Sequence, residues 1–583
     1  MFADFIGNKS IHMQFKQISF PGFRYKHSFL IIILCFFSLS SIAQGTYIMQ
    51  GDKANVLLER LEINGRTDSL LNFSKIKPYN RKNVLAAVNH FSNAHTTKNL
   101  SAVDIYNINR LRLNNTEFHT DSSVLMMRSK KSISKRFFQT PANLYEVHVK
   151  DFDLIINPMI NIQYSKESNN GEALFQNTRG LYVRGKLANK IGFFASITDN
   201  QEKTPLYVRG FESDRKALPG AGFYKDFKTT GYDFFDARGY FTFNATKYID
   251  VTFGYDRNFI GNGHRSLFLS DFGNSNLFLR LNTRIWKFNY QNLFMELHHA
   301  DRRVGDKLIG KKYAVMHHLD INLTKWLNVG LFEGIVFGRQ NRFDFGYLNP
   351  VIFYRSIEQQ NGSFDNAVVG MDVKANLANK FQVYGQLLLD EFNLAQIRAN
   401  SGWWANKWGI QLGGKYIDAL GIKNLDLQIE HNRVRPFTYA HTDSVANYTH
   451  YNLPMAHPLM ANFSENILMA RYQPAPKWTA IAKLIYYQQG RDSSSRSYGS
   501  NIFLPNVPPY RNGDYGYNIG SGLKTNVLYA SFVLSYEVKE NLFAEINAVY
   551  RKQQTKTPPI SATNTSIISL GIRWNVHKRE FDF

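Results

Sequence analysis

The sequence predicts an all-β fold: a large antiparallel transmembrane β-barrel with a small N-terminal helical region. Three observations lead to this prediction. Polar and apolar residues alternate along segments of about ten residues, the length that a tilted strand needs to cross a bilayer. Short turns and long loops alternate between these segments, as they do in transmembrane barrels. Aromatic residues make up 15% of the chain, which fits ring girdles at both membrane interfaces, although the core of a large soluble β protein is the alternative.

The segment 367–392 shows the alternation most clearly. Its first half places Val369 and Met371 on one face and Asp372 and Lys374 on the other. The pattern resumes after a short turn, which predicts an antiparallel hairpin. Soluble sandwiches generally use strands of about five or six residues, so arms of this length favour a transmembrane barrel.

Further hairpins repeat this pattern, and their turns share a small polar residue, a lysine and an apolar residue. The clearest hairpins are 180–198, 240–255 and 319–331. The other connections are long and rich in Gly, Tyr, Ser, Pro and Asn, as at 204–230, 440–461 and 491–522. From residue 145 onward, at roughly 24 residues per strand with its share of loop, the barrel should hold about 16 to 18 strands.

Residues 1–43 have the features of a signal peptide. Basic residues precede an apolar run that ends in small residues, and Ala43 closes a plausible cleavage site. An anchoring helix is the alternative, but the apolar run is too short for it. Lipidation of Cys35 is disfavoured because Leu34 precedes it, and Met13 is an alternative start.

Removal of this leader would also remove the one cysteine, so the mature chain could form no disulfide and no thiol-based site. The net charge would fall from +23 to about +20. This charge predicts an anionic partner, such as lipopolysaccharide phosphates or an acidic polysaccharide, and not nucleic acid. Solvated Lys and Arg in turns and at interfaces are an equally good interpretation.

The chain divides into a region at 44–140 and a barrel at 141–583. The first is predicted to be small and partly helical, either periplasmic or a plug at the barrel mouth. Ser101 and Asp104 resemble a capping box before a helix. The basic stretch 128–136 predicts a solvated linker, with a contact to the membrane surface as the alternative.

Few residues suggest chemistry. The segment 430–441, with His450 and His457 beyond it, holds histidines and a carboxylate that could bind zinc, but their spacing matches no metal signature. No Gly-x-Ser-x-Gly turn is present, so an enzyme is the weaker hypothesis and no cofactor is predicted. The loop 261–266 lacks the Lys-Ser/Thr pair and the helix of a phosphate cradle; a tight loop or a lumen constriction fits it better.

Sugar binding fits the residues better than catalysis does. Trp403 and Trp404 offer flat rings for pyranose faces, and Arg433 and Arg435 offer forked donors for carboxylate or phosphate. The competing interpretation places the tryptophans in an interface girdle and the arginines in the lumen.

Five motifs of the predicted barrel stand out together: Phe364–Asp372, Leu389–Phe392, Trp403–Lys407, Glu430–Pro436 and Asn447–Asn452. They resemble the capsule assembly Wzi family of outer-membrane proteins, and in particular the RemB-type gliding motility proteins of Bacteroidetes. The resemblance implies an outer-membrane barrel of about 18 strands that attaches or organises surface polysaccharide, or that supports gliding and adhesin movement. No residue with a defined role transfers.

The predicted function is therefore an outer-membrane barrel that attaches or organises capsular polysaccharide, with an accessory role in gliding motility. A solute channel is the main alternative, and an outer-membrane hydrolase is a third. The expected partners are the outer membrane with its lipopolysaccharide, surface polysaccharide, and the gliding machinery or adhesins. The last strand is expected to end at Phe583 and to be recognised there by the barrel-insertion machinery.

Overall fold

The computed structural model describes residues 45–66, 73–94, 100–119, 127–129, 132, 136–299, 308–351, 353–363 and 365–583. The predicted signal peptide, with Cys35 and Met13, lies outside the described residues, as does part of the basic stretch 128–136. Among the helices that are described, none is long and apolar enough to cross a membrane.

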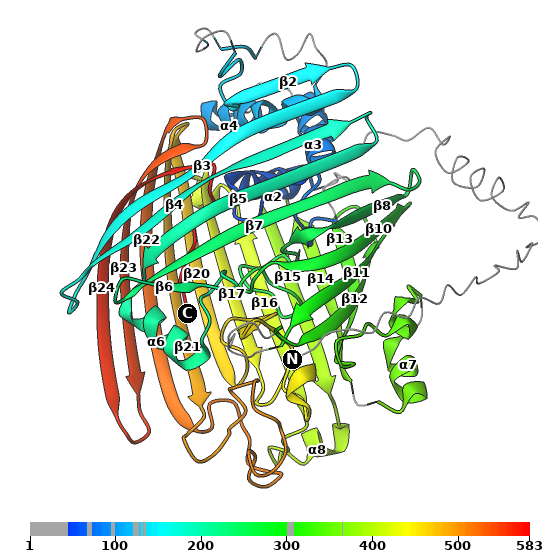
Figure 1. Ribbon diagram of the computed structural model, residues 1–583, viewed down its shortest axis with the longest axis vertical. Helices are drawn as coiled ribbons and strands as arrows, with labels where there is room; N and C mark the ends of the chain where they lie inside the picture. Colours follow the sequence, from blue (N-terminus) through cyan, green and yellow to red (C-terminus); the bar gives the residue numbers. More distant parts are fainter. Residues whose placement is uncertain are drawn as a thin grey trace, which may run out of the picture. The chain divides into compact units, whose positions relative to one another are not determined.

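In the described chain, 18 antiparallel strands form a closed barrel (Figure 1). Strand β24 pairs with β3 to close it, with Leu570 opposite Tyr164. The predicted all-β class and strand number are confirmed. The barrel strands are β3 Phe152–Glu167, β4 Ala173–Leu187, β5 Ile191–Lys203, β7 Gly231–Asn244, β8 Ile249–Asp256, β10 Asn276–Ile285, β11 Phe288–His298, β12 Lys311–Asn322, β13 Leu327–Phe337, β14 Asn366–Leu377, β15 Phe381–Glu391, β16 Lys407–Tyr416, β17 Leu425–Val434, β20 Phe463–Ala475, β21 Trp478–Arg491, β22 Leu523–Lys539, β23 Leu542–Thr555 and β24 Ser561–Trp574. The short strands are β1 Ile76–Lys77, β2 Tyr145–Val149, β6 Lys225–Phe227, β9 Phe259–Ile260, β18 Thr449–His450 and β19 Leu453–Pro454.

The barrel wall is apolar outside and polar inside. In β14, Val369 and Met371 are 44% and 47% exposed, whereas Asp372 and Lys374 are buried in the lumen. This arrangement is expected where lipid surrounds the wall. The predicted hairpin at 367–392 is confirmed by the pairing of β14 with β15, and those at 180–198, 240–255 and 319–331 by equivalent pairings.

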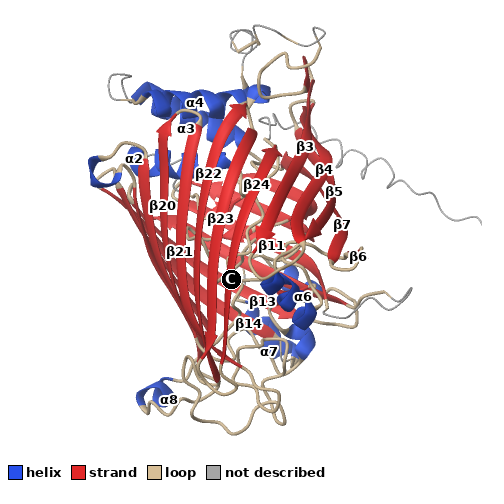
Figure 2. Cartoon of the chain, turned by 90° about the vertical axis from the view of Figure 1, so that its left-hand side faces the viewer, coloured by secondary structure: helices blue, strands red, loops and turns tan. Residues whose placement is uncertain are grey.

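Short turns and long connections lie at opposite ends of the barrel (Figure 2). At the short-turn end, residues 188–190 join β4 to β5 and residues 378–380 join β14 to β15. At the long-loop end, several connections contain helices. These are α6 Leu206–Arg215, α7 Tyr354–Asn361 and α8 Leu394–Arg398.

Three helices of the described N-terminal region lie at the short-turn end: α2 Lys53–Gly65, α3 Arg81–Ala94 and α4 Ala102–Leu113 (Figure 2). The predicted capping box of α4 is present, because Asp104 N donates to Ser101 Oγ at 3.1 Å and Ser101 N donates to Asp104 Oδ2 at 3.0 Å. The helices bury a common apolar cluster. Its members include Leu57, Leu58, Val84, Val88, Phe91, Ile108 and Leu111.

A loop of the chain fills part of the lumen. Residues 261–272 follow β9 and bury Leu267 and Phe268 completely. The Phe268 ring stacks on Phe332 of β13 at 4.3 Å, and Leu267 N donates to Gln386 Oε1 of β15 at 2.8 Å. The loop therefore narrows the lumen, in agreement with the sequence interpretation.

The chain after β24 also enters the lumen. Strand β24 ends at Trp574, so the prediction that it runs to Phe583 is wrong. Continued alternation would place Lys578 and Asp582 on the lipid-facing side, where charges are costly. Residues 575–583, which we call the tail segment, instead turn inward.

Candidate functional site

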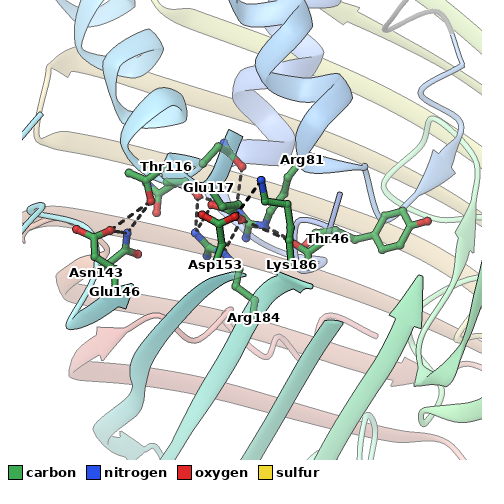
Figure 3. A network of polar contacts seen from close by, with 12 residues as sticks. Thr46, Arg81, Thr116, Glu117, Asn143, Glu146, Asp153, Arg184 and Lys186 are labelled. Carbon is green, nitrogen blue, oxygen red and sulfur yellow. Dashed lines mark hydrogen bonds and ion pairs between the residues drawn. The ribbon is translucent and has the colours of Figure 1, made fainter. Parts of the chain in front are cut away.

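A buried polar network joins the helical region to the barrel wall (Figure 3). Glu117 accepts a hydrogen bond from Arg184 Nε of β4 at 2.9 Å. Arg184 and Arg81 both donate to the backbone carbonyl of Asn114, at 2.7 and 2.9 Å. Burial alone would raise the pKa of Glu117, but Arg184 and Arg81 hold it below its ordinary value. This network fixes the helices on the wall.

Helix α2 is anchored to the lumen by charged side chains. Glu59 lies 3.0 Å from Lys415 of β16 and 3.1 Å from Lys77 of β1. Arg60 lies 2.9 Å from Asp418 and also pairs with Asp426 of β17. Because both charges have opposite-charge partners, the helix can lie against a polar lumen wall.

The tail segment is held by a cluster of buried charges. Asp582 lies 2.9 Å from Arg265 Nη1, 2.6 Å from Lys483 Nζ and 2.8 Å from His264 Nε2. Phe583 packs among rings, and Arg551 Nε donates to its carbonyl oxygen at 3.1 Å. The rings are Tyr207, Phe211 and Phe272.

A cavity of 460 Å³ remains between α2, the tail segment and the lumen face of strands β17 and β20–β24. Its volume lies in the range of small-molecule sites, about 300 to 1,000 Å³. Its walls carry eleven Lys and Arg against seven Asp and Glu, so the cavity is cationic.

A hydrolase would need a histidine beside both a carboxylate and a nucleophile. His264 lines the cavity and contacts Asp582. Within the described residues its other side-chain partner is Lys483 Nζ at 3.3 Å, and no hydroxyl or thiol bonds to its ring. This arrangement gives no acyl-transfer dyad.

Three of the four predicted glycan-contact residues lie together at the long-loop end. Arg435 donates from Nη2 to the backbone carbonyls of Trp403 and Tyr517, at 3.2 and 2.9 Å. The Trp403 and Trp404 ring centroids are 6.4 Å apart. We call this group and its neighbours the loop cluster. Its members are Trp403, Trp404, Arg435, Tyr510, Arg511, Tyr515 and Tyr517.

The loop cluster combines rings with guanidinium groups. Arg511 lies over the Trp404 ring, 4.2 Å from its centroid, and pairs with Asp514. Tyr510 and Tyr515 are 45% and 55% exposed at the same connection. Exposed rings beside fixed guanidinium groups can stack on sugar faces and bind carboxylates or phosphates.

Arg433 is separate from the loop cluster. Along β17, Glu430 and Asn432 face the lumen and are buried, whereas Arg433 is exposed on the outer wall. The interpretation that both arginines line the lumen is therefore wrong for Arg433, because alternation along β17 turns its side chain outward.

The histidines considered for metal binding make separate contacts. His431 bonds to Asn466 at 2.9 Å, and His457 bonds to Glu465 at 2.8 Å. His450 accepts from His298 N at 3.0 Å. No group of three or more His, Cys, Asp and Glu side chains in the described part of the chain could hold a metal ion.

The motifs behind the family resemblance build the lumen filling. Glu430 accepts from the backbone N–H groups of His264 and Arg265, at 2.6 and 3.0 Å, and from Tyr384 Oη at 2.8 Å. Lys312 Nζ donates to Asn447 in the same way, at 2.8 Å. These residues connect loops to the wall, which agrees with their interpretation as structural signatures.

Sequence reasoning missed Arg511, Tyr510 and Tyr515, although Tyr510-Arg511 shows the same pairing of ring and base that singled out the tryptophans. It also missed the cationic cavity. Arg257 and His577 line that cavity from segments 320 residues apart, and no local pattern reveals that two such distant segments share a cavity.

No protein-family model matches the chain, and no curated protein matches its sequence. Among solved structures, it resembles Wzi, an Escherichia coli outer-membrane protein involved in group 1 capsule assembly and described as a carbohydrate-binding β-barrel. The TM-score is 0.54 at 10% identity, over 92% of this chain and 100% of that chain. OprD of Pseudomonas aeruginosa gives 0.41 at 9% identity, over 73% of this chain and 96% of that one. OccAB2 of Acinetobacter baumannii gives 0.39 at 11% identity, over 72% and 98%.

The fold is thus that of an outer-membrane β-barrel. The particular fold is Wzi-like over 92% of this chain. The likeness to RemB-type gliding proteins stays a prediction.

Proposed function

We propose that this barrel holds surface polysaccharide at its long-loop end and does not conduct solutes. The observation that carries the proposal is the filled lumen: the loop 261–272, helix α2 and the tail segment occupy it. Because segments of the chain itself fill the lumen, we expect polysaccharide to bind to the loops. The likeness of fold to a carbohydrate-binding barrel supports this function.

The loop cluster is the proposed glycan contact. Outer-membrane barrels have short periplasmic turns and long extracellular loops, so the loop cluster faces the outside. Tyr510, Tyr515 and Trp403 supply the rings, and Arg435 with Arg511 supplies charge for an acidic sugar. Arg433 faces the bilayer from the outer wall near this end, where it suits lipopolysaccharide phosphates better than glycan.

Replacing both Tyr510 and Tyr515 with Ala should weaken binding of purified protein to the host polysaccharide about ten-fold, because each ring contributes roughly 0.5 to 1.5 kcal/mol. Calorimetry in detergent would measure the change. Trp286→Ala is the matched control, because this ring is 77% exposed but lies in the short β10–β11 turn. Equal losses in both variants would contradict the proposal.

The same double variant, placed in the native host, separates the two roles predicted from the sequence. Loss of retained polysaccharide with normal secretion supports attachment. Normal polysaccharide with impaired spreading on agar moves the assignment to gliding motility or adhesin movement.

The channel is the alternative function. Planar-bilayer recordings of the purified protein should show no steady single-channel conductance, because buried side chains from several segments block the lumen. Steady single-channel conductance would instead favour a porin with a water-filled lumen.

A further inference from the structure

The lumen cavity contains a cationic site that the proposed glycan role does not use. It lies toward the short-turn end, since its wall includes Lys415, Gln473 and Arg573, which come near the short turns of their strands. The loop cluster lies at the opposite end. A ligand of this cavity is therefore distinct from polysaccharide held by the loops.

Among the described Lys and Arg side chains that line the cavity, Arg257 is the one that forms no ion pair. Its Nη1 and Nη2 donate to the backbone carbonyls of Asp271 and Gly220, at 3.3 and 2.5 Å. Its Nε is buried without a hydrogen-bond acceptor among the described residues, and no carboxylate there lies within ion-pair distance of it. The nearby Asp236 and Asp256 instead pair with Arg238, at 2.5 and 3.6 Å. Burying a guanidinium group without an opposite charge destabilises the folded protein, and a bound anion would offset this desolvation cost.

The pKa of Arg257 is consistent with the absence of an ion pair among the described residues. Burial, and next the positive charge of Arg238, lower the pKa to about 10, although the carboxylates of Asp236, Asp271 and Asp256 act in the opposite direction. An ordinary paired arginine remains charged well above that value.

His577 of the tail segment provides a second side chain whose hydrogen-bonding capacity is not fully used by the described residues. Its Nδ1 is buried and has no hydrogen-bond partner among the described residues. A Cβ on Gly51 would come within 2.8 Å of the His577 side chain, and Gly51 has a φ of +76°, so glycine allows the close approach. Burial, and next Arg238 and Arg257, lower the pKa of His577 to about 3, so the ring is neutral and can donate one N–H.

Arg238, Arg257, His577 and Arg579 lie side by side, because all four line both the main cavity and a smaller one of 60 Å³ next to it. Arg579 pairs with Glu202 at 2.8 Å. We propose that Arg257 and His577, with Arg238 and Arg579 beside them, bind the carboxylate or phosphate group of a small acidic ligand. An acidic monosaccharide and a sugar phosphate share this chemistry and fit the cavity volume.

Calorimetry of the full chain in detergent, at constant ionic strength, tests the site with glucuronate, glucose 6-phosphate, inorganic phosphate and glucose. The acidic probes should show saturable binding and glucose none. Tighter binding of glucuronate than of both phosphates would identify the carboxylate, and the reverse order the phosphate. Absence of saturable binding by every acidic probe, or equal binding of glucose, would overturn the proposal.

Arg257→Gln should weaken binding of the acidic probe about ten-fold or more, because it removes a charge-assisted hydrogen bond. His577→Asn should also weaken it, and it serves as the test if Arg257→Gln does not fold. The matched control is Arg179→Gln, since Arg179 is exposed on the outer wall and pairs with Asp199. Wild-type affinity in a folded Arg257 or His577 variant would rule out the site. Arg257→Gln should weaken binding of the acidic probe by the same factor when it is added to the Tyr510/Tyr515 variant, which separates this site from the loop cluster.

Discussion

Asp582→Asn is expected to lower the free energy of unfolding by about 3 to 5 kcal/mol, the cost of removing one partner from a buried ion-pair cluster. Asp582 is 5% exposed and holds Arg265, Lys483 and His264 together. Burial alone would raise the pKa of Asp582, but Arg265 and Lys483 hold it well below its ordinary value. The amide cannot neutralise either cation.

Guanidinium unfolding followed by circular dichroism would measure this loss, and hydrogen exchange of the tail segment would show where it arises. Asp199→Asn is the control, because Asp199 pairs with the exposed Arg179 at 3.5 Å and exposed pairs contribute at most about 1 kcal/mol. Equal effects of the two substitutions would mean that the tail segment is not held by its charges.

The barrel wall could be predicted from the sequence because its signal is local. In β14, the parity that separates Val369 from Asp372 also decides which side chain faces lipid. One short turn then fixes the register of the hairpin, as the pairing of Leu377 with Phe381 shows. The capping box at Ser101 is local in the same sense.

The lumen could not be predicted in this way. Arg265 and Asp582 are 317 residues apart, and their contact depends on the closure of all the strands between them. One signal in the sequence does indicate that the chain leaves the wall after Trp574. Apolar and polar residues no longer alternate there, because the charged Lys578 and Asp582 occupy positions that would face lipid if the strand continued. The same limit applies to the site. Alternation could assign Arg433 to the outer wall, but loop contacts place Arg435 against Trp403.

Glu59→Gln is expected to loosen helix α2 and to remove about 3 kcal/mol of stability at neutral pH. Burial alone would raise the pKa of Glu59, but Lys415, Lys77 and Arg471 lower it from 4.5 to about 2. A carboxylate with a lowered folded-state pKa stabilises the protein above its unfolded-state pKa. That stabilisation is lost as the pH falls from about 4.5 to about 2.

The difference between wild type and Glu59→Gln therefore depends on pH. It should be full at pH 6, fall to less than half by about pH 3 and almost vanish by about pH 2. Chemical unfolding at these pH values would measure it, with other titrating groups cancelling in the comparison. Glu172→Gln is the matched control, because Glu172 also contacts two cations, Lys203 and Arg209, but is 41% exposed. A difference that stays constant over this pH range would mean that Glu59 does not anchor α2 through its charge.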